Sequence, residues 1–87
     1  MISLELFIAG TAANSSKALN NLKRALADLE IQVELAVVDV LHEPKRAWES
    51  GVLVTPMLVR RTPAPTQMLL GSMDDVTQVA AFIGATT

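Results

Sequence analysis

Residues 2–40 read ISLELFIAGTAANSSKALNNLKRALADLEIQVELAVVDV. At the start, residues 2–9 alternate between apolar and polar side chains and then become fully apolar, which is typical of a strand with one partly wet face. Apolar side chains then recur at helical spacing and predict a helix over residues 15–29. The β-branched residues of segment 31–40 predict a buried second strand. Because a long helix joins the two strands, we expect a parallel, right-handed β-α-β unit.

Polar residues at the start of this helix predict how it begins. The side chains of Asn14, Ser15 and Ser16 can accept hydrogen bonds from the first N–H groups of a helix, so we interpret them as N-caps. A serine here could act as a nucleophile only beside a base. The only histidine, His42, follows the second strand with no evident pairing and no second metal ligand at suitable spacing. We therefore expect an exposed turn residue at His42 and neither a catalytic nor a metal site.

The second half of the chain predicts a short helix and a hairpin. The helix lies between Pro44, which suits a first helical turn, and Gly51, which suits a helix end. Residues 57–61 and 67–70 predict two strands. The turn between them contains two prolines, which cannot donate to a strand ladder. The two strands are close enough in sequence for an antiparallel hairpin.

The last predicted helix covers residues 73–83. Ser72 resembles the first residue of a capping box, acidic residues occupy the first turn, and Gly84 marks the end. The predicted order is therefore β-α-β-α-β-β-α, with a parallel pair and a terminal hairpin. This order indicates an α/β protein with a mixed four-stranded sheet and a thioredoxin-like layout, formed by a single domain over residues 1–87.

The composition of the chain excludes several function classes. Its 87 residues suffice for one domain, and 51% are hydrophobic, which argues against disorder. A net charge of −2 gives no general attraction to nucleic acid or to anionic membranes. The lack of cysteine removes disulfides, thiolate metal sites and thiol redox chemistry. No basic segment precedes the first strand and no apolar run could span a bilayer, so we expect a cytoplasmic protein without a signal peptide.

Short motifs follow one another over residues 4–71. They are Ala9-Gly10, Asn14-Ser15 with Ala18 and Leu19, Asp39-Val40-Leu41 followed by Pro44, Thr55-Pro56 with Leu58, and Pro63 and Pro65 with Gly71. This ordered set resembles the KaiB family, which comprises cyanobacterial clock components and relatives in many other bacteria. The resemblance implies a non-enzymatic protein without a cofactor that binds a KaiC-type ATPase in circadian or stress-related signalling.

The resemblance also implies alternatives. One is fold switching between a thioredoxin-like monomer and a different, self-associating packing of the C-terminal half, so a homo-oligomer (a dimer or a tetramer) is an expectation. A related domain sits at the N-terminus of a clock-linked histidine kinase, which makes a histidine kinase a second candidate partner. The chain departs from the family pattern at Ala13 and Ala64, usually proline, at residues 66–68, usually basic, and at Ser72, usually acidic. These departures indicate a divergent paralogue.

The predicted sites lie in the second half of the chain. The resemblance implies a cis peptide bond at Pro56, whereas the residues alone also allow an ordinary trans proline that starts an edge strand. Arg60 and Arg61 form a basic doublet, interpreted either as two solvated side chains or as contacts for an acidic partner surface. Together with the stiff turn at Pro63 and Pro65, they make the hairpin the predicted partner-binding surface.

Two further interpretations remain open. Trp48 on the short helix is expected to be a packing anchor, with a binding hot spot as the alternative. The predicted layout is also that of a glutathione transferase N-terminal domain, and Thr55-Pro56 and Ser72-Met73-Asp74 loosely match its proline and its serine-acidic pair. A helix N-terminus at Ser72 would bind a carboxylate. A degenerate glutathione-binding protein is therefore the rival function, although a thiol and the helical second domain of a transferase are lacking.

Overall fold

The structure, a computed structural model, describes residues 1–84. Its elements follow the predicted order. They are β1 (Ile2–Ile8), α1 (Ala13–Leu29), β2 (Val33–Asp39), α2 (Pro44–Glu49), β3 (Met57–Thr62), β4 (Gln67–Leu70) and α3 (Val76–Ile83). None of the helices in this part of the chain is long and apolar enough to cross a membrane.

The strands form one mixed sheet in the order β2-β1-β3-β4. β1 runs parallel to β2 and antiparallel to β3, and β3 pairs antiparallel with β4 in the predicted hairpin. The predicted thioredoxin-like α/β fold with a mixed four-stranded sheet is therefore confirmed. The register of the β1–β3 pair shifts between Ser3 and Leu4, which leaves Arg61 as the extra residue of a β-bulge.

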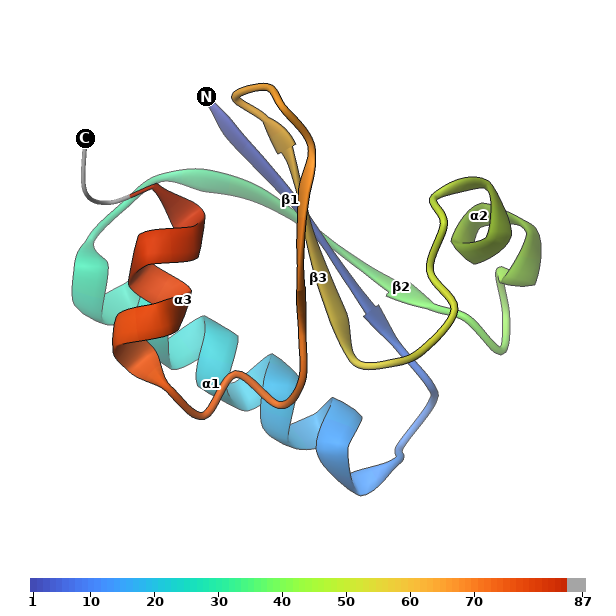
Figure 1. Ribbon diagram of the computed structural model, residues 1–87. Coiled ribbons are helices and arrows are strands. Elements are labelled where there is room, and N and C mark those ends of the chain that lie inside the picture. Colours follow the sequence, from blue (N-terminus) through green and yellow to red (C-terminus); the bar gives the residue numbers. More distant parts are fainter. Residues whose placement is uncertain (85–87) are drawn as a thin grey trace.

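The two faces of the sheet are covered differently. α1 and α3 lie together on one face of the sheet. The short helix α2 lies on the opposite face, near the C-terminal end of β1 (Figure 1). Alternate residues of β1 serve the two sides: Leu4 and Leu6 are buried with α1 and α3, whereas Phe7 is buried in a smaller cluster with Val38 and Ala47. We call the α2 side the open face, because α2 covers only part of it.

The prediction of a buried second strand is wrong. β2 is an edge strand, and Val38 is its only buried residue. Its remaining side chains are partly or fully exposed because α2 covers one end of the open face and no strand lies beyond β2 among residues 1–84. The β-branched composition predicted a strand correctly but not its place at the edge.

The predicted N-caps of the first long helix are also wrong. α1 begins at Ala13, and its N-cap residue, Ala12, makes no side-chain hydrogen bond. Ser15 is buried inside the first turn, where its Oγ accepts a hydrogen bond from the N–H of Ala9 at 3.0 Å. The hydroxyl therefore satisfies the backbone at the end of β1 instead of capping the helix.

The last helix starts later than predicted. α3 begins at Val76, and its N-cap is Asp75, whose Oδ1 accepts from the N–H of Gln78 at 3.1 Å. Met73 is buried and has a φ of 64°, outside the right-handed helical region, so the chain cannot be helical there. The Ser72 hydroxyl donates to Asp74 and caps nothing. Gly84 ends α3 with a φ of 94°, as predicted, and α2 spans the predicted segment.

The two candidate caps give different stability effects. Asp75→Ala is expected to lower the free energy of unfolding by about 1 kcal/mol, because it removes the side chain that caps α3. Ser72→Ala is expected to cost about 0.5 kcal/mol or less, because its exposed hydroxyl contacts only Asp74. Chemical denaturation of the two variants and the wild type measures both values. If Ser72→Ala lowered the free energy of unfolding more than Asp75→Ala, the result would contradict Asp75 as the N-cap of α3 and indicate Ser72 instead.

Candidate protein-binding surface

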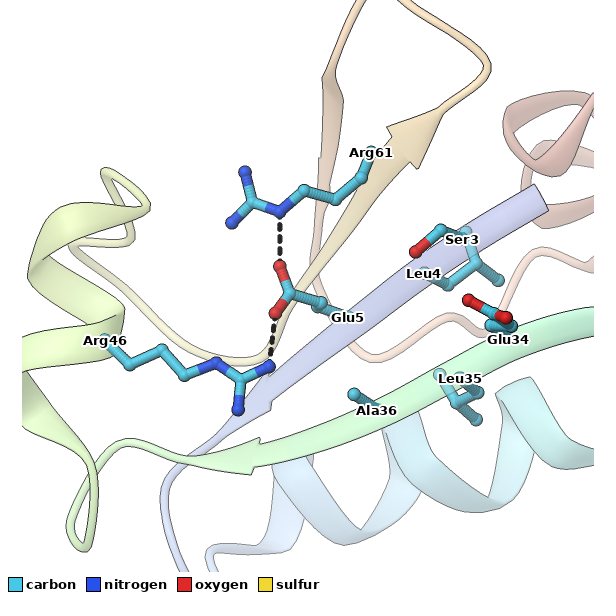
Figure 2. Close-up of a pocket in the computed structure, with 8 residues that line it drawn as sticks. All are labelled: Ser3, Leu4, Glu5, Glu34, Leu35, Ala36, Arg46 and Arg61. Atoms are coloured by element: carbon cyan, nitrogen blue, oxygen red, sulfur yellow. Dashed lines mark hydrogen bonds and ion pairs between the residues drawn. The ribbon is translucent and has the colours of Figure 1, made fainter. Parts of the chain in front are cut away.

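The open face centres on Glu5, the only charged residue of β1. Its carboxylate accepts hydrogen bonds from Arg46 Nη2 at 2.6 Å and from Arg61 Nε at 2.5 Å (Figure 2). Arg46 belongs to α2 and Arg61 to the bulge of β3, so one carboxylate joins both elements to the central strand. Arg61 also donates from Nη2 to Ser50 Oγ at 2.6 Å, immediately after α2.

The electrostatics of this cluster favour an ionised carboxylate. The Glu5 side chain is only 12% exposed, whereas Arg46 and Arg61 are 43% and 38% exposed. Burial opposes ionisation, but the hydrogen bonds and charges of the two arginines outweigh it and hold the pKa of Glu5 below its ordinary value of 4.5. The same contact raises the pKa of Arg46. The cluster is therefore held by charge-assisted hydrogen bonds at neutral pH.

A shallow hollow of about 320 Å³ lies beside this cluster. Figure 2 shows its lining, which comes from β1, β2, α2 and β3: Ser3, Leu4, Glu5, Glu34, Leu35, Ala36, Arg46 and Arg61. Its two arginines are both bound to Glu5, and its lining includes neither histidine nor cysteine. The charged groups at the centre of the hollow thus form a satisfied ion-pair cluster.

The structure separates Arg60 and Arg61, which are neighbours in sequence. Arg60 lies on the α3 side, where Nη1 donates to the Phe82 carbonyl at 3.0 Å and Nη2 to Gln67 Oε1 at 3.1 Å. Its guanidinium carbon is 5.9 Å from the centroid of the Phe82 ring, within cation–π range. Both arginines are half-buried and bound within the chain, so the interpretation as two solvated side chains is wrong. A partner contact at Arg60 and Arg61 stays a prediction.

The prolines identified in the sequence differ in burial: Pro56 is buried, and Pro63 and Pro65 are exposed. The Thr55–Pro56 peptide bond is cis, the isomer that the resemblance implies, and Pro56 is buried. The Thr62–Pro63 and Ala64–Pro65 bonds are cis as well, which the sequence does not predict. Pro63 and Pro65 are exposed in the turn between β3 and β4, so they are accessible for the partner-binding role that remains a prediction for this hairpin.

The prediction that Trp48 is a packing anchor is wrong. Its side chain is 75% exposed, and its neighbour Ala47 is the α2 residue that packs against the sheet. A helix of six residues buries one narrow face, and Ala47 occupies it. Three other large apolar side chains are exposed close by in the sequence: Leu41, Leu53 and Val54. We call residues 41–54 the α2 segment.

Asp39 at the end of β2 fixes the start of the α2 segment. Its Oδ1 accepts hydrogen bonds from the N–H groups of Leu41 and Gly10, both at 3.0 Å. The bond from Leu41, together with that from Gly10, lowers the pKa of Asp39. His42 is the predicted exposed turn residue, with Nε2 3.7 Å from Asp39 Oδ2. Within residues 1–84, no group of three or more His, Asp or Glu side chains could hold a metal ion.

The carboxylate site that the sequence suggests at Ser72 is contradicted. Ser72 does not open a helix, and the true N-terminus of α3 is already capped by the carboxylate of Asp75. A second carboxylate there would meet a like charge instead of free N–H groups. The match at Ser72-Met73-Asp74 that pointed to glutathione binding is therefore lost, whereas the match at Thr55-Pro56 is unaffected.

Comparison with known sequences gives a consistent result. The KaiB domain model matches residues 5–84. Circadian clock protein KaiB3 from Synechocystis sp. is 37% identical over 79 residues, which cover 90% of this chain and 78% of that protein. Circadian clock oscillator protein KaiB from Synechococcus elongatus is 39% identical over 74 residues, which cover 83% of this chain and 72% of that protein. The resemblance found in the motifs is confirmed.

Two solved structures are also similar. The N-terminal domain of Synechococcus elongatus SasA matches with a TM-score of 0.77 and 30% identity, covering 94% of this chain and 78% of that one. Oxidised mitochondrial thioredoxin 3 from Saccharomyces cerevisiae matches with a TM-score of 0.79 and 18% identity, covering 97% of this chain and 77% of that one. The likeness to thioredoxin shows a shared fold alone.

The Glu5 cluster is expected to contribute to the stability of the fold. Glu5→Gln is expected to lower the free energy of unfolding at neutral pH by about 1–2 kcal/mol, because the amide loses charge-assisted bonds to two half-exposed arginines. Glu49→Gln is a matched control, since Glu49 pairs with Lys45 at 3.8 Å with both side chains largely exposed. Its effect is expected to stay within about 0.5 kcal/mol.

The same variant has a pH signature. Folding lowers the pKa of Glu5, so its contribution is present above the ordinary value of 4.5 and is lost as the pH falls through the lower folded value. The stability gap between wild type and Glu5→Gln should therefore narrow on acidification. Urea denaturation over a series of pH values measures the gap. A gap that stays constant into the acid range would contradict an ionised Glu5 as its source.

Proposed function

The chain belongs to the KaiB family, and from this premise we propose that it is a non-catalytic module that binds and regulates a KaiC-type ATPase. One observation supports a binding role most strongly: Trp48 is 75% exposed on a helix that is fixed to the sheet. Tryptophan is enriched among residues that dominate binding energy, and a rigid anchor loses little entropy on docking. The α2 segment is the proposed contact surface.

The surroundings of Trp48 fit a protein partner. Leu41, Leu53 and Val54 add exposed apolar surface, while Lys45 and Glu49 supply charged groups around it. A binding site of this kind has an apolar centre and a polar rim. Hydrogen bonds from Arg46 to Glu5 and from the Leu41 N–H to Asp39 fix the segment to the sheet, which limits the entropy lost on docking.

The hairpin between β3 and β4 is the second proposed contact. Pro63 and Pro65 are exposed at its turn, where restricted backbone dihedrals reduce the entropy lost on docking. Arg60 and Arg61 belong to this surface as well, although each already binds groups of its own chain. An alanine change at either arginine therefore alters the fold as well as the surface, and a variant at the turn tests docking more cleanly.

A histidine kinase system is the second candidate partner. The likeness to the SasA N-terminal domain, at 30% identity, supports it, because that likeness exceeds a shared fold. Under this proposal the same α2 segment would bind the histidine kinase. Titration against a KaiC-type ATPase and a histidine kinase from the same organism distinguishes the two partners.

Trp48→Ala is expected to weaken binding to the ATPase at least about tenfold, because it removes the central apolar contact. The free energy of unfolding should change by about 0.5 kcal/mol or less, since the side chain is exposed in the free protein. Val76→Ala is the control: Val76 is 54% exposed on α3, on the opposite side of the sheet, and should bind like wild type. Calorimetric titration in each nucleotide state of the ATPase measures affinity.

Two outcomes would overturn parts of this proposal. Equal affinity of Trp48→Ala and wild type would remove the α2 segment as the contact surface. No detectable binding of wild type in any nucleotide state would exclude the KaiC-type ATPase as partner.

Ala64→Glu tests the hairpin separately. If the hairpin contacts an acidic surface, the added carboxylate should weaken binding severalfold at low salt and less at high salt, because salt screens exposed charges. Ala64 is exposed, so folding should be unaffected. Equal affinity at both salt concentrations would take the hairpin out of the interface and leave the α2 segment as the sole contact.

A further inference from the structure

The α2 segment buries little apolar surface of its own. α2 has six residues, and Ala47 is the buried one among them. Val52, which follows the helix, is buried in the same small apolar cluster. A helix this short is not stable in isolation, so its position depends on contacts with the sheet. Two small side chains supply the apolar part of those contacts.

Glu5 supplies the polar part from the centre of the sheet. β1 pairs with β2 on one side and with β3 on the other, so Glu5 is a fixed point between them. Its carboxylate accepts from Arg46 Nη2 at 2.6 Å, within the segment. It also accepts from Arg61 Nε, while Arg61 Nη2 donates to Ser50 Oγ at the end of α2. One carboxylate thus holds the segment directly at Arg46 and indirectly at Ser50.

The other carboxylate near Arg46 cannot do the same. Glu43 Oε1 lies 3.7 Å from Arg46 Nη1, but Glu43 belongs to the α2 segment, so this contact does not join the segment to the sheet. Without the charge of Glu5, two guanidinium groups that share one carboxylate would be left as neighbouring like charges. The middle of the segment would keep only its small apolar contacts with the sheet.

We propose that Glu5 is the positioning residue of the α2 segment, which holds Trp48 in the arrangement that binds a partner without belonging to the contact surface itself. The inference rests on the proposed function of that surface. The Glu5 side chain is 12% exposed and Trp48 is 75% exposed, so a partner reaches Trp48 and little of Glu5. When the binding-competent arrangement is only partly populated, the apparent affinity falls by that fraction. Glu5 thus sets the affinity by setting this population.

Amide hydrogen exchange in the free protein tests the positioning without a partner. The N–H groups of Ala47 and Ser50 are bonded to the carbonyls of Glu43 and Arg46, so their exchange reports opening of α2. In Glu5→Gln both amides should exchange about tenfold faster than in wild type or more, because local opening becomes easier.

Asp75→Ala is the matched control for this measurement. It is expected to lower the stability of the fold by a similar amount, but it acts at α3, on the opposite face of the sheet. Exchange at Ala47 and Ser50 should stay within about twofold of the wild-type rate, because local opening of α2 does not depend on α3.

Titration against the KaiC-type ATPase tests the consequence for binding. Glu5→Gln should weaken binding by about fivefold or more, whereas Asp75→Ala should bind like wild type. Arg46→Gln should weaken binding as well. The double variant with both changes should bind like Glu5→Gln alone, because the two residues act through one contact. If Arg46 bound the partner directly, the two losses would multiply.

Four results would each overturn the proposal. They are wild-type exchange at Ala47 and Ser50 in Glu5→Gln, wild-type affinity of Glu5→Gln, equal weakening by Asp75→Ala, and multiplying losses in the double variant. If Glu5→Gln does not fold, Arg46→Gln takes its place in the exchange and affinity measurements, since Arg46 is half-exposed. If wild type does not bind the ATPase, the proposed partner fails, and the exchange rates of the free protein still decide whether Glu5 positions the segment.

Discussion

The contact of Glu5 with Arg46 and Arg61 determines how the open face is built. α2 has only six residues, too few to be stable as an isolated helix, so its place depends on what holds it to the sheet. Ala47 supplies a small apolar contact and Arg46 supplies the ion pair. Because Glu5 also binds Arg61 in the β3 bulge, the carboxylate fixes the helix and the hairpin relative to the same strand.

This attachment explains why the α2 segment presents its apolar residues to solvent. With Arg46 directed to Glu5 and Ala47 packed against the sheet, the next residue, Trp48, is turned outward. Asp39 holds the preceding loop through Leu41, whose side chain is exposed as well. Within the α2 segment, Ala47 and Val52 pack against the sheet, whereas Leu41, Trp48, Leu53 and Val54 are exposed. Several large apolar side chains exposed on one short segment are typical of a binding surface.

Much of the fold can be predicted from sequence because periodicity and turn residues are local signals. The element order, the parallel β-α-β unit and the hairpin follow from them. Tertiary burial decides the rest. Ser15 can cap a helix in principle, but it is buried beside Ala9 and binds that backbone instead. Ser72 and Asp75 are both good cap residues, and only the burial of Met73 selects Asp75. The bulge that separates Arg60 from Arg61 leaves no sequence signal that we can identify.

The likeness to thioredoxin shows a shared fold only, and the chemistry has to be inferred from the residues themselves. In an active thioredoxin the start of the first helix carries the reactive Cys-x-x-Cys pair, where the helix N-terminus stabilises a thiolate. The corresponding segment here, Thr11 to Ser15, contains no thiol, and its buried hydroxyl at Ser15 is occupied by the N–H of Ala9. The position that carries the chemistry in a thioredoxin serves the packing of β1 against α1 in this chain. Since a fold does not determine function, the proposed role of this chain rests on the exposed apolar side chains of the α2 segment and not on the likeness to thioredoxin.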